Sequence, residues 1–447
     1  MKKHVKRVLM GLMAASFALS HVTMAAADEV SELKALVGTL MNRVDELEKK
    51  VGQYEAKEKQ QQMKVSHVER KIDDVAEELD EVKMSSSSEM GEVFNGIDIG
   101  LGMTTIYQFT DNANGDSLSQ NGEDVGDASW SLDLELSKSF EDYGSAYMLL
   151  EAGQGGGVDE ELAIFSPVNF DATGGDAKIE MVEGWYEHYI DDTTMTFGKL
   201  DGTIYIDTNA YANDEGGQFL GNMFRNNSTV QFPDNGAGVR LAHVFNDHFE
   251  VETVVMDGNG DWEDIFDGPF VAVQTNVKPG LSDQEGNYRF YGWSSNQDHT
   301  KFVDTASSEN ANFGFGLSFD QELTDLIGIF ARYGYQNPEV YLTGGDAVTI
   351  EHAYSIGMQL AGEPWGREDD VFGLAFGQAI PSDDYKNANS GLKADTESHI
   401  EAYYNIFVND HLSVSPMVHV IVDPYGNDAT NGDKTIVVGG VRSQVDF

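Results

Sequence analysis

The chain has 447 residues, with 28 Lys and Arg against 76 Asp and Glu, and it contains no Cys. A formal net charge of −48 argues against nucleic acid as a partner, and the lack of Cys excludes disulfides and thiolate metal sites. With 47 Gly and 11% aromatic residues, the composition favours strands and tight turns over helix bundles.

Residues 1–27 have the pattern of an export signal. Basic residues at the start are followed by a short apolar run, Val8 to Leu19, and Ala25 to Ala27 offer small residues for cleavage. The apolar run is too short to span a bilayer, so we expect removal of the segment before Asp28. Export with removal predicts an envelope protein, and a chain without a spanning helix can enter a membrane only as a closed barrel.

Residues 28–84 carry a heptad repeat that predicts a periplasmic α-helical coiled coil. The a and d positions from Val30 to Val82 are apolar except for Glu58 and Gln61. The first half favours dimers and the second half trimers, so oligomer formation is predicted while its order stays open. A Ser-rich linker follows at residues 85–95.

Residues 96–447 change to a period of two, which predicts β-strands. Phe313, Phe315 and Phe319, for example, alternate with Gly, Ser and Asp. We count about fifteen such segments of roughly ten residues, the length of a tilted membrane strand. One face is apolar and ends in aromatic residues, while the other is too polar for a packed sandwich core but suits a wet lumen. The fold class is therefore predicted to be all-β, a closed antiparallel transmembrane barrel preceded by the coiled coil.

Two details concern the last strands. The terminal segment VVGGVRSQVDF predicts a closing strand, with Phe447 at the periplasmic boundary, where barrel-assembly machinery would bind it. Pro416 lies inside another predicted strand, and Pro cannot donate to the ladder. A bulge or a lost ladder bond is expected there.

Several blocks of the barrel region carry a family resemblance. They include GKLDGTIYIDTNAYANDEGGQFL at 198–220, GNYRFYGW at 286–293 and EPWGREDDVFGLAFGQA at 363–379, and the blocks spread over residues 198–447. They are similar to carbohydrate-selective porins of the OprB family. The resemblance implies a 16-stranded barrel, usually trimeric, that passes sugars by diffusion through an eyelet lined by infolded loops. The coiled coil is an addition to that family's core.

Alternation places four cations, Arg240, Arg289, Arg332 and Arg442, on the lumen face, together with Trp293. An inward Arg can bind sugar hydroxyls, or it can balance nearby carboxylates and fix loops. Trp293 can contact a sugar ring or pack against an infolded loop. Both readings stay open for each residue.

Residues 207–227 are too long and too mixed in composition for a plain turn, and they predict a loop folded into the barrel as its constriction. The alternative is a lid on the outer rim. The pore candidates in this segment are Asp207, Asn209, Tyr211, Asn213, Gln218 and Arg225.

Residues 257–264 resemble a calcium loop, with Asp257, Asn259, Asp261 and Glu263 spaced like hard-oxygen ligands. Trp262 stands where such a loop needs Gly, so an acidic outer loop is the simpler interpretation. The sequence shows no Gly-rich phosphate loop, nucleophile elbow or His-metal spacing. It therefore predicts neither an enzyme nor a cofactor.

The predicted function is an outer-membrane porin of a Gram-negative-type bacterium that lets small hydrophilic solutes, carbohydrates above all, diffuse passively. The acidic balance keeps a general cation-preferring porin open as an alternative. A plugged barrel that anchors the envelope through its coiled-coil stalk is another. The stalk is expected to assemble oligomers or to reach the cell wall.

Overall fold

The computed structural model describes residues 96–447 except 116–123, 173–176, 264, 267, 281–283, 308–309, 389–394 and 427–433. The predicted signal peptide, coiled coil and linker, residues 1–95, lie outside the described residues. The described part is almost entirely β-structure, as predicted. No helix in it is long and apolar enough to cross a membrane.

The elements follow the chain in a simple order. The strands are β1 (Asp98–Asp111), β2 (Gly126–Ser139), β3 (Gly144–Gln154), β4 (Glu180–Ile190), β5 (Thr193–Leu200), β6 (Gly236–Asn246), β7 (Phe249–Met256), β8 (Phe270–Val277), β9 (Gly286–Lys301), β10 (Asn310–Thr324), β11 (Ile327–Gln336), β12 (Val340–Leu342), β13 (Ile350–Ala361), β14 (Val371–Pro381), β15 (Glu397–Asn409), β16 (Leu412–Val422) and β17 (Ile436–Asp446). The short helical turns are η1 (Asp159–Glu161), η2 (Gly202–Ile204), α4 (Asn222–Arg225), η3 (Glu363–Trp365), α5 (Asp383–Ala388) and η4 (Pro424–Gly426).

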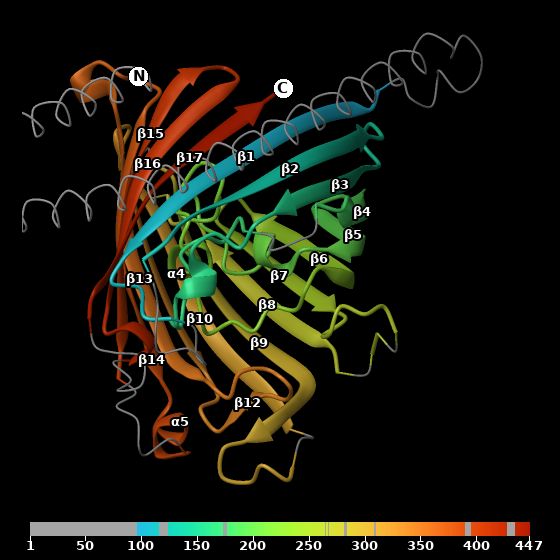
Figure 1. The fold of residues 1–447 in the computed structure, drawn as a ribbon. Coiled ribbons are helices and arrows are strands. Elements are labelled where there is room, and N and C mark those ends of the chain that lie inside the picture. The colour runs from blue at the N-terminus through green and yellow to red at the C-terminus, as the bar shows by residue number, and fades with distance from the viewer. Residues whose placement is uncertain are drawn as a thin grey trace, which may run out of the picture. The chain divides into compact units, whose positions relative to one another are not determined.

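The strands form one closed antiparallel barrel (Figure 1). Sequential strands pair with each other, and β1 pairs with β17 to close the ring. The sheet has 17 strands, but β12 pairs with the end of β9 while β11 pairs directly with β13, so 17 − 1 = 16 strands make the ring. This confirms the predicted barrel and the strand number that the resemblance implied.

Alternation sorts the side chains as expected. On β1, Tyr107 and Phe109 are each 53% exposed on the outside, whereas Ile106 and Gln108 are 1% and 0% exposed on the inside. An apolar exterior around a polar interior is the arrangement of a barrel in lipid. At the chain end, Arg442 pairs with Ile106, and the Phe447 N–H donates to the Leu101 carbonyl, so the predicted closing strand is confirmed.

Pro416 interrupts one of its two ladders. Along β16 the pairing with β17 runs through Pro416↔Val441 without a shift. Toward β15, the pairs on either side are Tyr403↔Met417 and Ile406↔Val414, and the rungs between them are absent. The register is the same on both sides, because the two unpaired residues on β15 are matched by two on β16. Pro416 therefore removes ladder bonds without adding a bulge. The lost-bond alternative is the correct one.

The two ends of the barrel differ. One end carries tight turns such as those between β4 and β5 and between β15 and β16, and both the start of β1 and the end of β17 lie there. The other end carries the long connections. Two of these, residues 155–179 (the short loop) and residues 201–235 (the long loop), supply buried side chains, and the segments of the long loop with α4 lie inside the ring in Figure 1.

Candidate pore and its constriction

The long loop is fixed to the inside of the barrel by a buried ion pair. Asp207 and Arg332 lie 3.1 Å apart, and both side chains are 0% exposed. The Arg332 guanidinium also donates to the carbonyls of Ala212 and Phe224, each at 2.6 Å. Burial raises the pKa of Asp207, while the Arg332 charge and the Asn227 N–H oppose that rise. Arg332 on β11 therefore holds both ends of the predicted constriction segment.

Two further wall residues bind the middle of the same loop. The N–H groups of Leu220 and Gly221 donate to the Glu401 carboxylate at 2.8 and 3.0 Å. Arg442 donates to the Gln218 carbonyl at 2.9 Å and also contacts the Glu215 carbonyl. Arg332 and Arg442 thus both point inward, as predicted, and both donate to backbone carbonyls of the long loop.

Apolar packing supports these hydrogen bonds. Phe219, Met223 and Phe224 of the long loop form a buried cluster with wall residues such as Phe330 and Tyr403. Glycines on the same wall make room for the loop. A Cβ on Gly328 would lie 2.1 Å from the Tyr211 ring, and a Cβ on Gly377 would lie 2.6 Å from Met223. In this cluster the long loop lies tightly against β11 and β13–β16.

The short loop is anchored in the same way. The Phe165 and Ser166 N–H groups donate to Glu397, at 2.9 and 3.2 Å. Within the loop, the Asp159 carboxylate accepts from the Val168 and Asn169 N–H groups at 2.9 and 3.0 Å. Anionic acceptors for backbone N–H groups make strong, short bonds. Glu397 and Glu401 lie four residues apart on β15, so one strand face holds both loops.

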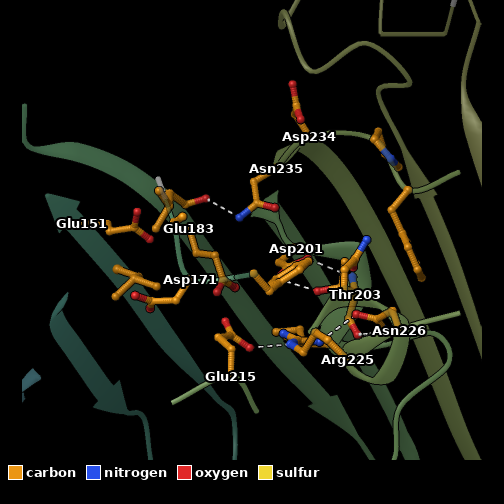
Figure 2. Close-up of a pocket in the computed structure, with 18 of the residues that line it drawn as sticks. Glu151, Asp171, Glu183, Asp201, Thr203, Glu215, Arg225, Asn226, Asp234 and Asn235 are labelled. Atoms are coloured by element: carbon orange, nitrogen blue, oxygen red, sulfur yellow. Dashed lines mark hydrogen bonds and ion pairs between the residues drawn. The ribbon is translucent and has the colours of Figure 1, made fainter. Parts of the chain in front are cut away.

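A cavity of about 1180 Å³ remains between these loops and the wall formed by β2–β5. Figure 2 shows acidic side chains from the wall and loops, among them Glu151, Asp171 and Glu183, gathered around it, with Arg225 and Glu215 of the long loop beside them. The acidic residues that line it are Asp133, Glu151, Asp171, Glu180, Glu183, Asp201, Glu215 and Asp234. The basic ones are Lys178, Lys199 and Arg225. Their formal balance is 3 − 8 = −5.

Among the predicted pore residues, Arg225 lines this cavity. Its guanidinium forms an ion pair with Glu215 and lies 5.1 Å from the centroid of the Phe170 ring. Phe170 is 37% exposed, so the ring offers an apolar surface beside charged groups. That combination suits a solute with both hydroxyl groups and C–H faces.

Asn209, Tyr211, Asn213 and Gln218 help to fold and fix the long loop. Asn209 donates to Ser318 and to the Phe319 carbonyl. The Tyr211 carbonyl accepts from Gln359, and the Asn213 N–H donates to the Gln218 side chain. These four residues are not among those that line the cavity.

The remaining candidates on the wall also have protein partners. Arg240 pairs with Glu187 at 3.1 Å and with Glu252, and its guanidinium lies 4.6 Å from the Tyr205 ring centroid. Arg289 pairs with Asp320.

Trp293 lies inward as predicted. Its ring stacks on Phe270 at 6.2 Å within a buried cluster that includes Tyr205 of the long loop. Of the two readings left open for Trp293, packing against an infolded loop is the observed one.

Sequence reasoning missed the acidic wall and the short loop. Asp133 alternates with the apolar residues Leu132 and Leu134 in the sequence, which indicates an inward side chain, but that it meets Glu151 depends on the cross-strand register Asp133↔Glu151. Phe170 and Asp171 belong to a loop whose length alone could have drawn attention. Burial raises the pKa of Asp171 to about 7, since the Ser131 hydroxyl only partly offsets it and the charges of Glu215 and Asp133 add to the rise.

The acidic side chains of the calcium-like segment accept hydrogen bonds from backbone N–H groups of the same segment. Asp257 is buried and accepts from the Trp262 N–H at 2.9 Å, and Asp261 accepts from the Glu263 N–H at 2.8 Å. Asn259 bonds to Asp261 as well. Among the residues that the structure describes, no group of three or more His, Cys, Asp or Glu side chains could hold a metal ion.

Comparison with known proteins agrees with this architecture. Residues 121–447 match the family described as carbohydrate-selective porin, OprB family. Pseudomonas putida OprB, solved at high pH, has the same fold with a TM-score of 0.66, at 15% identity, over 82% of this chain and 97% of that one. A protein of Aquifex aeolicus (strain VF5) is 28% identical over 182 residues, which are 40% of this chain and 47% of the relative, so the match spans about half of that relative's length. Because the family match covers well over half of the chain, this protein belongs to the OprB family of carbohydrate-selective porins.

Proposed function

We propose that the protein is an outer-membrane porin through which small hydrophilic solutes, carbohydrates in particular, diffuse passively. The path runs along the inner face of β2–β5, and the long loop narrows it from the opposite side. The observation that carries this proposal is the cavity of about 1180 Å³ left between that wall and the anchored loop. Membership of a carbohydrate-selective porin family supports the choice of solute.

The lining suits neutral polar solutes. Carboxylates accept hydrogen bonds from hydroxyl groups, while Phe165 and Phe170 supply apolar surface close by. Contacts of this kind are weak one by one, which lets a solute enter and leave again. Catalysis has no part in the proposal, since the family and the fold are those of channels.

Reconstitution in a planar bilayer tests the proposal. The purified protein is expected to give stepwise ion currents that fall as glucose is added, because a sugar in the constriction displaces the conducting water. A barrel that gives no current would instead favour the plugged envelope anchor.

The acidic lining favours one alternative, a general cation-preferring porin. The formal balance of −5 in the cavity should attract cations into a confined, low-dielectric space. Strong cation preference combined with currents that glucose does not affect would support this alternative over the carbohydrate porin.

Assembly is part of the same proposal. We infer a homo-oligomer, with a trimer favoured, from the family resemblance and from the heptad pattern in residues 28–84, and we assign the coiled coil to the periplasm. Cross-linking of the full chain in membranes, compared with a chain lacking residues 28–84, would show whether that segment sets the subunit number. Deleting Phe447, which is 73% exposed at the end of the closing strand, should slow insertion into the outer membrane if assembly machinery binds it.

A further inference from the structure

The lumen wall carries a second feature on the turn side of the cavity, a stacked aromatic pair. Tyr147 on β3 and Trp185 on β4 are direct cross-strand partners, with ring centroids 5.2 Å apart and planes 27° from parallel. Leu149 and Glu183 of the same strands line the cavity, and Tyr147 and Trp185 each lie two residues closer to the strand end with the tight turns, on the same face. Both rings are only partly buried. Aromatic surface is thus presented to the polar lumen just below the constriction.

The register shows what surrounds the pair. The row toward the cavity reads Glu135, Leu149 and Glu183 across β2–β4, and the row of the pair itself reads Ser137, Tyr147 and Trp185. Carboxylates therefore lie on both sides above the rings. Trp185 is fixed in place, because its Nε1–H donates to Glu183 at 3.1 Å.

The two faces of this aromatic pair are not equivalent. Trp185 covers one face of Tyr147. On the other side stands Ser137, whose hydroxymethyl group is too short to cover a phenol ring. Across from Trp185 lies Gly198, where a Cβ would sit 2.7 Å from the Trp185 Cα, so the strands approach closely there. The second face of Tyr147 is left toward the lumen, next to Ser137 and beneath Glu135.

We propose that Tyr147, supported by Trp185, is a carbohydrate-contact site on the periplasmic side of the constriction, and that it binds the C–H face of a pyranose ring. The negative face of an aromatic ring attracts the weakly positive C–H groups of such a sugar, and the flanking carboxylates accept its hydroxyl protons. Because acidic side chains, Glu135, Glu183 and Glu187, are gathered on this wall, neutral and amino sugars are favoured over sugar acids. This site rests on the proposed function, since it serves a solute that has passed the cavity.

Sugar block of the reconstituted full-length channel tests the site. Tyr147→Ala and Tyr147→Leu are expected to raise the glucose concentration for half-block about 3- to 10-fold, the range that an aromatic contact of this kind supports. Tyr147→Phe keeps the ring and should stay within about 2-fold of the natural protein. Tyr186→Ala is the matched control, because Tyr186 is the neighbour of Trp185 on the outward face and contacts Phe140 and Phe197.

Other solutes separate ring stacking from a mere change in pore width. Sorbitol has the size of glucose but no ring face, so its effect should not depend on Tyr147. Glucosamine should block the natural channel at least as well as glucose, and glucuronate should block it less. Equal glucose block in the natural protein, Tyr147→Ala and Tyr147→Leu would overturn the site while leaving the porin intact. Absence of glucose block in the natural protein would overturn the carbohydrate function itself.

Discussion

Replacing Arg332 by Met should release the long loop from the barrel wall. The change leaves the Asp207 carboxylate buried without its counter-ion, and it also removes the donor that serves the Ala212 and Phe224 carbonyls. Breaking a buried ion pair from one side costs about 3–5 kcal/mol. Since 1.4 kcal/mol is a factor of ten, the equilibrium constant for loop release should rise about 100-fold or more.

Limited proteolysis measures that release directly. Arg225 is the only Lys or Arg in residues 201–235 and is 4% exposed, so trypsin can cut after it only when the loop opens. Cleavage tracks the population of the open form when opening and closing are fast. The fragment that ends at Arg225 should therefore form about 100-fold faster in Arg332→Met, and single-channel currents should become larger and noisier.

Two controls sharpen this test. Lys278→Met breaks a partly exposed pair with Glu250, whose side chains are 43% and 32% exposed, and should leave cleavage unchanged. Combining Arg332→Met with Asp207→Leu removes both charges, so part of the loss should be recovered because no charge is left buried alone. If cleavage after Arg225 and channel noise both stay at the natural level in Arg332→Met, the buried pair does not hold the loop and the reasoning fails.

Three further outcomes follow from the same geometry. Glu401→Gln leaves one of two loop N–H groups facing an amide NH₂, so it should destabilise the closed loop by about 1–3 kcal/mol and speed cleavage after Arg225; unchanged cleavage would contradict that anchor. Gly328→Ala forces a Cβ into the Tyr211 ring and should lower barrel stability by about 1–3 kcal/mol, measured by urea unfolding in detergent; equal stability would show that the ring moves freely. The pKa of Asp171 is raised to about 7, so the group is ionised above that pH and neutral below it. Cation preference, read from reversal potentials in a salt gradient, should therefore fall as pH drops through about 7, and Asp171→Asn should remove that part of the change.

The barrel was predictable because the side-chain alternation that defines it can be read within each single strand. Each residue of β1 points either to hydrocarbon or to the lumen, so the alternation of Tyr107 and Phe109 with Gln108 is written into the sequence itself. Sixteen strands in the ring match the number expected from the family resemblance. Pro416 shows the limit of such local reasoning, since only the register distinguishes a lost ladder bond from a bulge.

The infolded loop was predictable in part. The apolar and amide-rich composition of residues 207–227 indicated a buried loop, and the inward direction of Arg332 and Arg442 followed from parity. What each Arg binds did not follow, because the partners are backbone carbonyls more than 100 residues away. The same reason explains why the short loop was missed, since its burial depends on Glu397 accepting backbone N–H groups far along the chain.

The most direct test of the solute path uses thiol labelling, because the chain contains no Cys of its own. Glu151→Cys places a thiol on the wall of the cavity, and Ala353→Cys places one on the inward face that is 1% exposed beneath the long loop. In a planar bilayer, a charged methanethiosulfonate reagent should reduce the current of Glu151→Cys in steps and leave that of Ala353→Cys unchanged. Block of Ala353→Cys with no effect on Glu151→Cys would place the water-filled path on the opposite wall and contradict the account.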